Sequence, residues 1–299
     1  MDAKPAVHPD LAVGDALVAF ARDILDEART AVDDEARSGA QAVHDFRKAM
    51  KRWRALLRLI DPFIGEDGPR LRMEARDLAR ELAGARDAQS ALDALDDLGK
   101  ADGAVGENAM AGMRKRLMEI RQSAEATTLT ETMRGRLRAA LTAADLATIT
   151  WPLAAVSFPA LAGELAAGYG RARHAMPGDF LKADSHTLHE LRQRVVAHRY
   201  QMELVEPLWP RLGKLWIGEA QRLRDRLGAH HDLDMLTGLT APHQLLARWR
   251  SRLAPVIAVR QEAHARAAAR LAGRLFAERP KAFRRRLEAL WASRSGGGE

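Results

Sequence analysis

Apolar residues recur every three or four positions along most of the chain, which is the spacing of one buried face of an α-helix. In the segment 41–60, for example, Val43, Phe46, Met50 and Trp53 return to one side of a helical wheel. The alternating runs rich in Val, Ile and Thr that would indicate strands are absent from the sequence. The pattern therefore predicts an all-α protein. We expect helices at 11–37, 41–60, 69–83, 107–125, 129–146, 160–174, 185–205, 212–227, 242–278 and 280–293, with a short helix beginning at Asp87.

Proline and glycine mark the expected ends of these helices. From their positions, breaks are predicted at 61–62, 65–69 and 99–106. Pro255 lacks an amide hydrogen, so it should kink or divide the long segment 242–278. Residues 293–299 are expected to form a disordered tail.

Two segments of the sequence match each other at a constant offset. VHDFRKAMKRWRALLRLIDP occupies 43–62, and LHELRQRVVAHRYQMELVEP occupies 188–207. The matched pairs include His44 with His189, Arg47 with Arg192, Arg54 with Arg199, Pro62 with Pro207 and Asp87 with Asp232. A register held without a gap over this length predicts an internal duplication, with halves at about 9–150 and 151–292.

The helix expected at 41–60 has a basic face opposite its apolar face. The members of this face are His44, Arg47, Lys48, Lys51, Arg54 and Arg58, with Arg52 at its edge. No carboxylate interrupts the arc, although like charges one turn apart repel one another. Cations that repeat at about one helical pitch, 5.4 Å, suit an anion with repeated charges. The alternative is a solvated face that lacks acidic residues by chance.

The corresponding face of the second segment is less basic. His189, Arg192 and Arg199 repeat the pattern, but Gln193, Val196 and Glu203 replace three of the cations. The two halves therefore offer unequal numbers of cations to a ligand. If His44 and His189 contact phosphate, protonation near pH 6 is expected to strengthen that contact.

Charge and composition narrow the range of partners. A net charge of +7 and a pI near 10.1 favour a polyanion. The absence of cysteine excludes disulfides and thiolate chemistry, and it fits a reducing cytoplasm. The least polar stretch, 151–170, contains two prolines and a glutamate, so no membrane span is expected. No apolar signal-peptide core follows the N-terminus. We expect a soluble cytoplasmic protein.

Several histidines invite a metal-binding or catalytic interpretation. His186 and His189 have a spacing that can chelate a metal, but the residue that corresponds to His186 in the first half is Gln41. His44-Asp45 lies within a predicted helix, where neighbouring side chains point about 100° apart. His231-Asp232 is expected after a helix end, with Asp232 as the cap of the next helix, and Asp87 should do the same in the first half. Phosphate-cradling glycine loops and nucleophile elbows are missing. We predict no metal, no cofactor and no catalytic residue.

The repeated elements resemble the CHAD family, the conserved-histidine α-helical domains. VHDFRK at 43–48 and LHELR at 188–192 are followed by LAGARD at 82–87 and LGAHHD at 227–232, although Ala83 stands where the family usually has glycine. LFAERPKAF at 275–283 resembles the closing segment of the family. The resemblance covers the chain from about Pro9 to Trp291.

This resemblance implies one domain over 9–292, built of two helical bundles that are related by a pseudo-twofold axis. Basic residues of both bundles would line a central pore or groove that binds inorganic polyphosphate. The site residues that it implies are His44, Arg47, Lys48, Lys51, Arg54, Arg58, His189, Arg192 and Arg199. Family members are associated with polyphosphate granules, and some carry a fused triphosphate-tunnel (CYTH) domain. The E-x-E-x-K motif of that domain is absent here, so we expect a standalone member.

Two other functions stay open. A nucleic-acid-binding protein could use the same basic face, but that face has no aromatic residues for base stacking and no Asn or Gln for base edges. An enzyme that acts on phosphate anhydrides, with histidine as phosphate acceptor, would need a carboxylate cluster for Mg²⁺, and none is evident. We therefore expect polyphosphate binding without catalysis.

Overall fold

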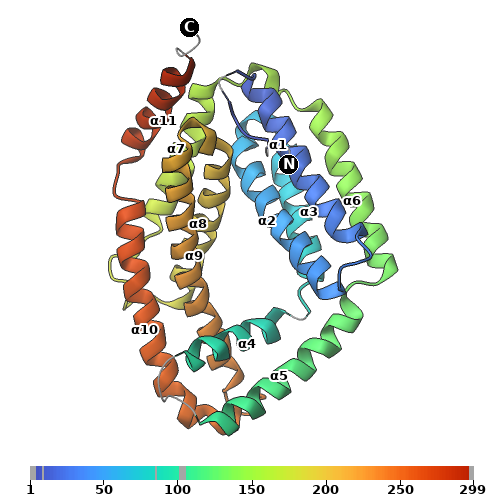
Figure 1. The fold of residues 1–299 in the computed structure, drawn as a ribbon, viewed down its shortest axis with the longest axis vertical. Helices are drawn as coiled ribbons and strands as arrows, with labels where there is room; N and C mark the ends of the chain where they lie inside the picture. The colour runs from blue at the N-terminus through green and yellow to red at the C-terminus, as the bar shows by residue number, and fades with distance from the viewer. Residues whose placement is uncertain (1–4, 9, 85, 101–105, 296–299) are drawn as a thin grey trace.

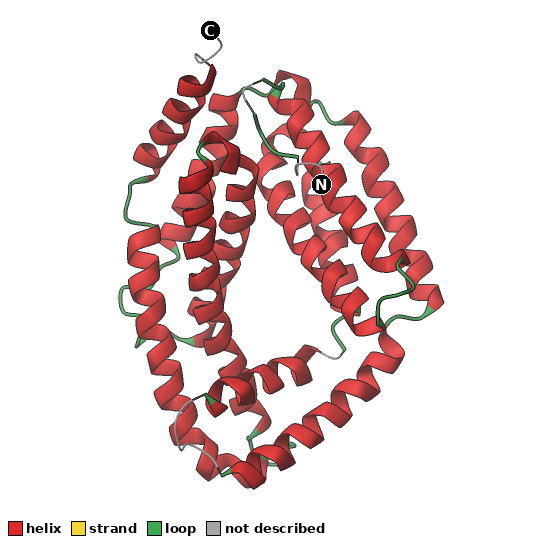
Figure 2. Ribbon diagram, viewed as in Figure 1, coloured by secondary structure: helices red, strands yellow, loops and turns green. Residues whose placement is uncertain are grey.

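The structure, a computed structural model, describes residues 5–8, 10–84, 86–100 and 106–295. Within these ranges it contains eleven α-helices, three short 3₁₀ helices and no strand (Figure 2), which confirms the predicted all-α class. The α-helices are α1 (Val13–Asp33), α2 (Gly39–Ile64), α3 (Asp67–Glu81), α4 (Arg86–Gly99), α5 (Glu107–Thr128), α6 (Glu131–Thr150), α7 (Phe158–His174), α8 (Ser185–Val205), α9 (Pro210–Leu239), α10 (Arg250–Leu275) and α11 (Pro280–Ser295). No helix in the described ranges is both long enough and apolar enough to cross a membrane.

The helices form two groups that are joined at both ends (Figure 1). α1, α2, α3 and α6 lie on one side, and α7 to α11 lie on the other. α2 and α8 meet between the groups, where Gln201 Nε2 donates a 3.0 Å hydrogen bond to the carbonyl oxygen of Ala55. α4 and α5 connect the lower ends of the groups in Figure 1, and α4 packs against α9.

Two buried apolar clusters hold this arrangement together. The larger draws on α1, α2 and α3 as well as on α7, α8 and α11, and its fully buried side chains include Trp53, Tyr169 and Phe283. The smaller joins α4 and α5 to α9 and α10, for example through Leu95 and Leu236. Both clusters contain residues from before and after position 150, so the two predicted halves share their cores. The duplication itself stays a prediction.

The predicted end of the helix at 212–227 is wrong. α9 continues to Leu239, because its extension buries Leu233 and Leu236 in the smaller cluster. His231 and Asp232 consequently lie inside α9, and Asp232 caps no helix. Asp87 is also not a cap. It lies in the first turn of α4, where a carboxylate interacts favourably with the helix dipole.

Prolines interrupt the helices less than predicted. Pro62 lies inside α2, which ends at Gly65, a glycine with a φ of 58°. Pro255 lies near the start of α10 and does not divide it, since Leu253 and Ile257 on either side are buried in the smaller cluster. α11 continues through Ser295, so residues 293–295 are helical instead of forming a tail. Residues 296–299 lie outside the described ranges.

Arg52 is not at the edge of the basic face, where the sequence placed it. Only 3% of its side chain is exposed, and it pairs with Asp23 at 3.4 Å, with Glu27, and with Glu203 at 3.6 Å. The two first carboxylates belong to α1 and the third to α8. Arg52 therefore links three helices and is not available to a ligand.

Candidate functional site

A cavity of about 530 Å³ lies between the two groups of helices. α2 and α3 form one wall, α8 and α9 form the other, and Ala83 and Arg86 lie where α4 begins. Ten of its eighteen described lining residues are Arg or Lys, and none of the eighteen is Asp or Glu. The cations are Arg47, Lys51, Arg54, Arg58, Arg76, Arg80, Arg86, Arg192, Arg199 and Arg224. We call this space the central cavity.

Seven of the nine predicted binding residues line the central cavity. They are Arg47, Lys51, Arg54 and Arg58 from α2 and His189, Arg192 and Arg199 from α8. His44 and Lys48 do not line it and are exposed elsewhere on α2. Lys48 is turned about 60° from Lys51 around the helix, and His44 lies one turn nearer the helix start than Arg47. The central residues of the predicted basic face therefore line the cavity, whereas His44 and Lys48 at its margin do not.

Sequence reasoning missed four arginines of the central cavity. Arg76 and Arg80 lie one turn apart on α3, Arg86 begins α4, and Arg224 lies on α9. The spacing of Arg76 and Arg80 was a usable signal, but both have Asp77 nearby, at 3.0 and 3.9 Å. Arg224 had no such signal, because the register of the repeat places Ala79 opposite it. Only the packing of α9 against α8 brings Arg224 to the site.

The cations of the α2 wall differ in their contacts. Lys51, Arg54 and Arg58 form no ion pair or hydrogen bond with any other described residue. Arg47 donates through one terminal nitrogen to the carbonyl oxygens of Ala79, at 2.8 Å, and Leu82, at 3.1 Å. These carbonyls lie at the C-terminal end of α3, which needs such donors. Arg47 thus completes a helix end while it lines the cavity.

The α8 wall is more nearly neutral. Arg199 pairs with Glu203 at 2.8 Å, and its guanidinium lies 4.1 Å from the centre of the Tyr200 ring. Arg192 faces Gly228 of α9, where a Cβ would lie 3.5 Å from its Nε atom. That Nε is buried and has no hydrogen-bond partner among the described residues. Arg192 and Arg199 are the two arginines of this wall that match arginines of α2 in the sequence repeat. Of these two, Arg192 is the one available to a ligand.

Desolvation, followed by repulsion between neighbouring cations, lowers the pKa values of several lining groups. The side chain of Lys51 is exposed to solvent but lies in the central cavity, where the surrounding protein partly desolvates its ammonium group. This desolvation, together with repulsion from Arg192 and Arg224, lowers the pKa of Lys51 to about 7. Burial, together with repulsion from Arg54, lowers the pKa of Arg58 to about 10. At neutral pH Lys51 is therefore only partly protonated in the absence of an anion, whereas Arg58 stays charged.

His189 does not titrate near pH 6 in the unliganded protein. Burial and the neighbouring His231, whose ring centre is 4.6 Å away, lower the pKa of His189 to about 4. The stronger phosphate contact expected near pH 6 concerns the protein with its ligand bound, and it stays a prediction. Asp45, the neighbour of His44, pairs with Arg37 at 2.9 Å. Within the described ranges, no group of three or more potential ligands could hold a metal ion.

The sequence model of the CHAD domain matches residues 19–241, which is well over half of the chain. The chain belongs to the CHAD domain family. This confirms the resemblance on the motifs at 43–48, 82–87, 188–192 and 227–232, all of which fall within the match.

Solved structures show the same fold. The chain is similar to PptA from Streptomyces chartreusis, with a TM-score of 0.66 and 19% identity over 90% of this chain and 100% of that one. It is also similar to the CHAD domain from the plant Ricinus communis, with a TM-score of 0.60 and 22% identity over 96% of this chain and 95% of that one. No curated protein sequence matches the chain.

Proposed function

We propose that this CHAD protein binds inorganic polyphosphate in the central cavity and does not alter it chemically. The observation that carries the proposal is the lining of the cavity, with ten cations and no carboxylate among its described residues. Like charges enclosed at this density repel one another, and an anion with many charges relieves that repulsion. In this proposal, the central cavity corresponds to the basic pore or groove that the family resemblance implied.

The shape and chemistry of the lining favour polyphosphate over nucleic acid. Tyr200 is the one Phe, Tyr or Trp in the described lining, and the Arg199 guanidinium covers its ring. The imidazole of His189, which also lines the cavity, lies against that of His231, with the ring centres 4.6 Å apart. Bases therefore find no uncovered Phe, Tyr or Trp ring on which to stack in the described lining. Gln193 is the one amide side chain that lines the cavity, which is too few for reading base edges. A chain of bare phosphates needs neither kind of contact.

A direct titration tests the choice of ligand. Long-chain polyphosphate, tripolyphosphate and single-stranded RNA are compared at equal phosphate concentration and at two salt concentrations. Polyphosphate should bind most tightly, and its affinity should fall as salt rises because each phosphate contact releases counterions. RNA that binds as tightly as polyphosphate would favour the nucleic-acid function instead.

The absence of catalysis needs its own measurement. Incubation with polyphosphate and Mg²⁺ should leave the chain-length distribution unchanged on a gel, since binding alone requires no nucleophile or metal. Release of phosphate that a His189→Ala variant abolishes would overturn this part of the proposal. In cells, the tagged protein should colocalise with cytoplasmic polyphosphate granules.

A further inference from the structure

Two further spaces adjoin the central cavity. A narrow passage of about 150 Å³ shares Arg58, Gln193 and Ala197 with it. An outer groove of about 1040 Å³ in turn shares Arg171, Glu190 and Arg194 with the passage. The outer groove and the central cavity have no lining residue in common, so the passage is what connects them.

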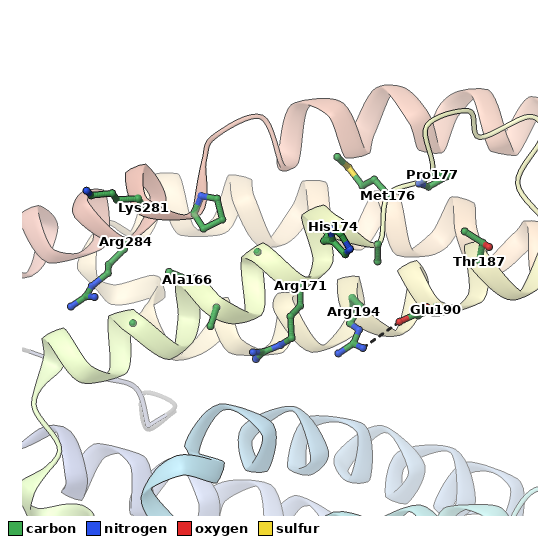
Figure 3. Close-up of a pocket in the computed structure, with 15 residues that line it drawn as sticks. Ala166, Arg171, His174, Met176, Pro177, Thr187, Glu190, Arg194, Lys281 and Arg284 are labelled. Carbon is green, nitrogen blue, oxygen red and sulfur yellow. Dashed lines mark hydrogen bonds and ion pairs between the residues drawn. The ribbon is translucent and has the colours of Figure 1, made fainter.

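The outer groove lies between α7, α8 and the start of α11, and it is also basic. Figure 3 shows Arg171 and Arg194 pointing from α7 and α8 toward the first group of helices, whereas Lys281 and Arg284 lie farther along the groove, on α11. Small residues of α7, including Gly163 and Ala166, leave the groove floor open. A chain that lies in the groove would therefore meet backbone on one side and cations along its length.

One carboxylate faces this groove and the passage. Glu190 pairs with Arg194 at 3.3 Å, as the dashed line in Figure 3 marks. Arg171 and Lys281 form no ion pair with any described residue, and both are exposed. Cations therefore outnumber the single acid, and two of them are free to bind an anion.

The cations of the passage act on those of the central cavity. Arg58, which lines both spaces, has a pKa lowered to about 10 by burial and then by repulsion from Arg54, Arg72, Arg194 and Arg171. Arg171 and Arg194 line the passage together with Arg58, so an anion in it would meet all three. An anion in the passage would lower the repulsion on both sides at once.

A buried histidine borders the passage. His198 is 1% exposed, and its Nε2 accepts a 2.8 Å hydrogen bond from the indole nitrogen of Trp216. An indole N–H can only donate, so the proton of the neutral imidazole must lie on Nδ1. That Nδ1 is buried and has no acceptor among the described residues, although His198 lines the passage. His198 therefore borders the passage as a neutral imidazole, and the cations that an anion there would meet are Arg58, Arg171 and Arg194.

We propose that these three spaces form one route for a single polyphosphate chain. A chain held in the central cavity leaves it past Arg58, runs between Arg171 and Arg194, and lies in the outer groove beside Lys281. This inference rests on the proposed function and adds to it a second binding segment. Short anions would occupy the central cavity alone, whereas long chains would occupy the whole route.

The experiment compares tripolyphosphate with long-chain polyphosphate in direct titrations. The variant Arg171→Gln with Lys281→Gln removes two exposed cations of the route and leaves the central cavity intact. Its affinity for long polyphosphate should fall about tenfold, and its affinity for tripolyphosphate should change by less than about twofold. The matched control, Arg116→Gln with Arg285→Gln, removes the same charge at exposed positions that line none of the three spaces. It should change neither affinity by more than about twofold.

Glu190→Gln provides a test of opposite sign. This substitution removes the one carboxylate among the described residues that line the route. The affinity for long polyphosphate should rise about threefold, and the affinity for tripolyphosphate should not change. The route is wrong if long-chain affinity survives the first variant, or if the control loses as much affinity as the variant does. In either case unchanged tripolyphosphate binding would leave the proposed function standing. Failure of the wild-type protein to bind tripolyphosphate or long polyphosphate would overturn both proposals.

Discussion

The α2 and α8 walls of the central cavity match in sequence but differ in what their cations contact. On α2, Lys51, Arg54 and Arg58 have no charged partner among the described residues. On α8, Arg199 is already paired with Glu203 at 2.8 Å. The α2 wall therefore holds most of the charge that a ligand can neutralise. A repeated motif can thus keep its arginines and still lose part of its capacity to bind.

The helices behind these walls explain a second difference. α3 ends at Glu81 and leaves the carbonyls of Ala79 and Leu82 for Arg47. α9 continues through the corresponding positions, so its carbonyls stay within the helix and Arg192 has no such acceptor. The same arginine of the motif is held in place in one half and available in the other.

The largest expected effect is the loss of unpaired cations from the α2 wall. Each charge-assisted contact to phosphate is worth about 1.5–3 kcal/mol. Lys51→Ala with Arg58→Ala should therefore lower polyphosphate affinity about hundredfold, as measured by isothermal titration calorimetry. The matched variant of the α8 wall, Arg192→Ala with Arg199→Ala, should lose about tenfold, because Arg199 is already neutralised. The opposite order would show that the α8 wall dominates binding.

Replacement of Arg47 and replacement of Arg192 should change the stability of the protein differently. Arg47→Ala removes two hydrogen bonds to the end of α3, so the free energy of unfolding should fall by about 2 kcal/mol in a urea titration. Arg192→Ala removes a guanidinium whose Nε has no partner, so it should leave stability unchanged or raise it. Equal destabilisation by the two variants would contradict the different roles assigned to them.

Binding should depend on pH through Lys51, whose pKa is about 7 in the unliganded protein. Bound phosphate favours the charged form and raises this pKa. Below pH 7 the amine is already protonated, but above it binding must add a proton, so affinity falls as pH rises. We expect affinity about tenfold lower at pH 8.5 than at pH 6.5. Lys51→Arg keeps the charge and should flatten the profile, whereas an unchanged slope would place the titrating group elsewhere.

The smallest effect expected concerns Glu203. Glu203→Gln removes the carboxylate that pairs with Arg199, while Arg52 keeps Asp23 and Glu27 as partners. Affinity for polyphosphate should rise two- to threefold, about 0.5 kcal/mol, which makes the walls more alike. Circular dichroism controls for folding, since Glu203 also lies 3.6 Å from Arg52. Weaker binding would mean that the carboxylate positions Arg199 instead of competing for it.

Periodicity predicted the fold class and the centre of the site, because both depend on local spacing. The helix at 185–205 was predicted at its observed bounds, and the cavity-lining cations Lys51, Arg54 and Arg58 followed from the wheel. What failed were boundaries that tertiary contacts decide. α9 extends beyond residue 227 because its added turns are buried against α4 and α5, which local sequence does not reveal.

The sequence did not predict which residues meet across the helices around the cavity, because tertiary packing decides these contacts as well. Arg52 has the charge and position of a binding residue, but carboxylates from α1 and α8 surround it. Arg224 has no counterpart in the first half and enters the site through helix packing. A helical wheel shows which residues share one face of a helix, but it does not show which residues of other helices pack against that face.

The smaller apolar cluster has a consequence for how the chain is made. Leu95 and Met113 leave the ribosome well before Leu236 and Leu253, with which they are buried. Until those later helices emerge, α4 and α5 have only each other to cover their apolar faces, and contacts so distant in sequence form slowly. A fragment cut near residue 150 should therefore expose this surface and self-associate, although the repeat suggests a natural boundary there. The two halves of this protein complete their folding together.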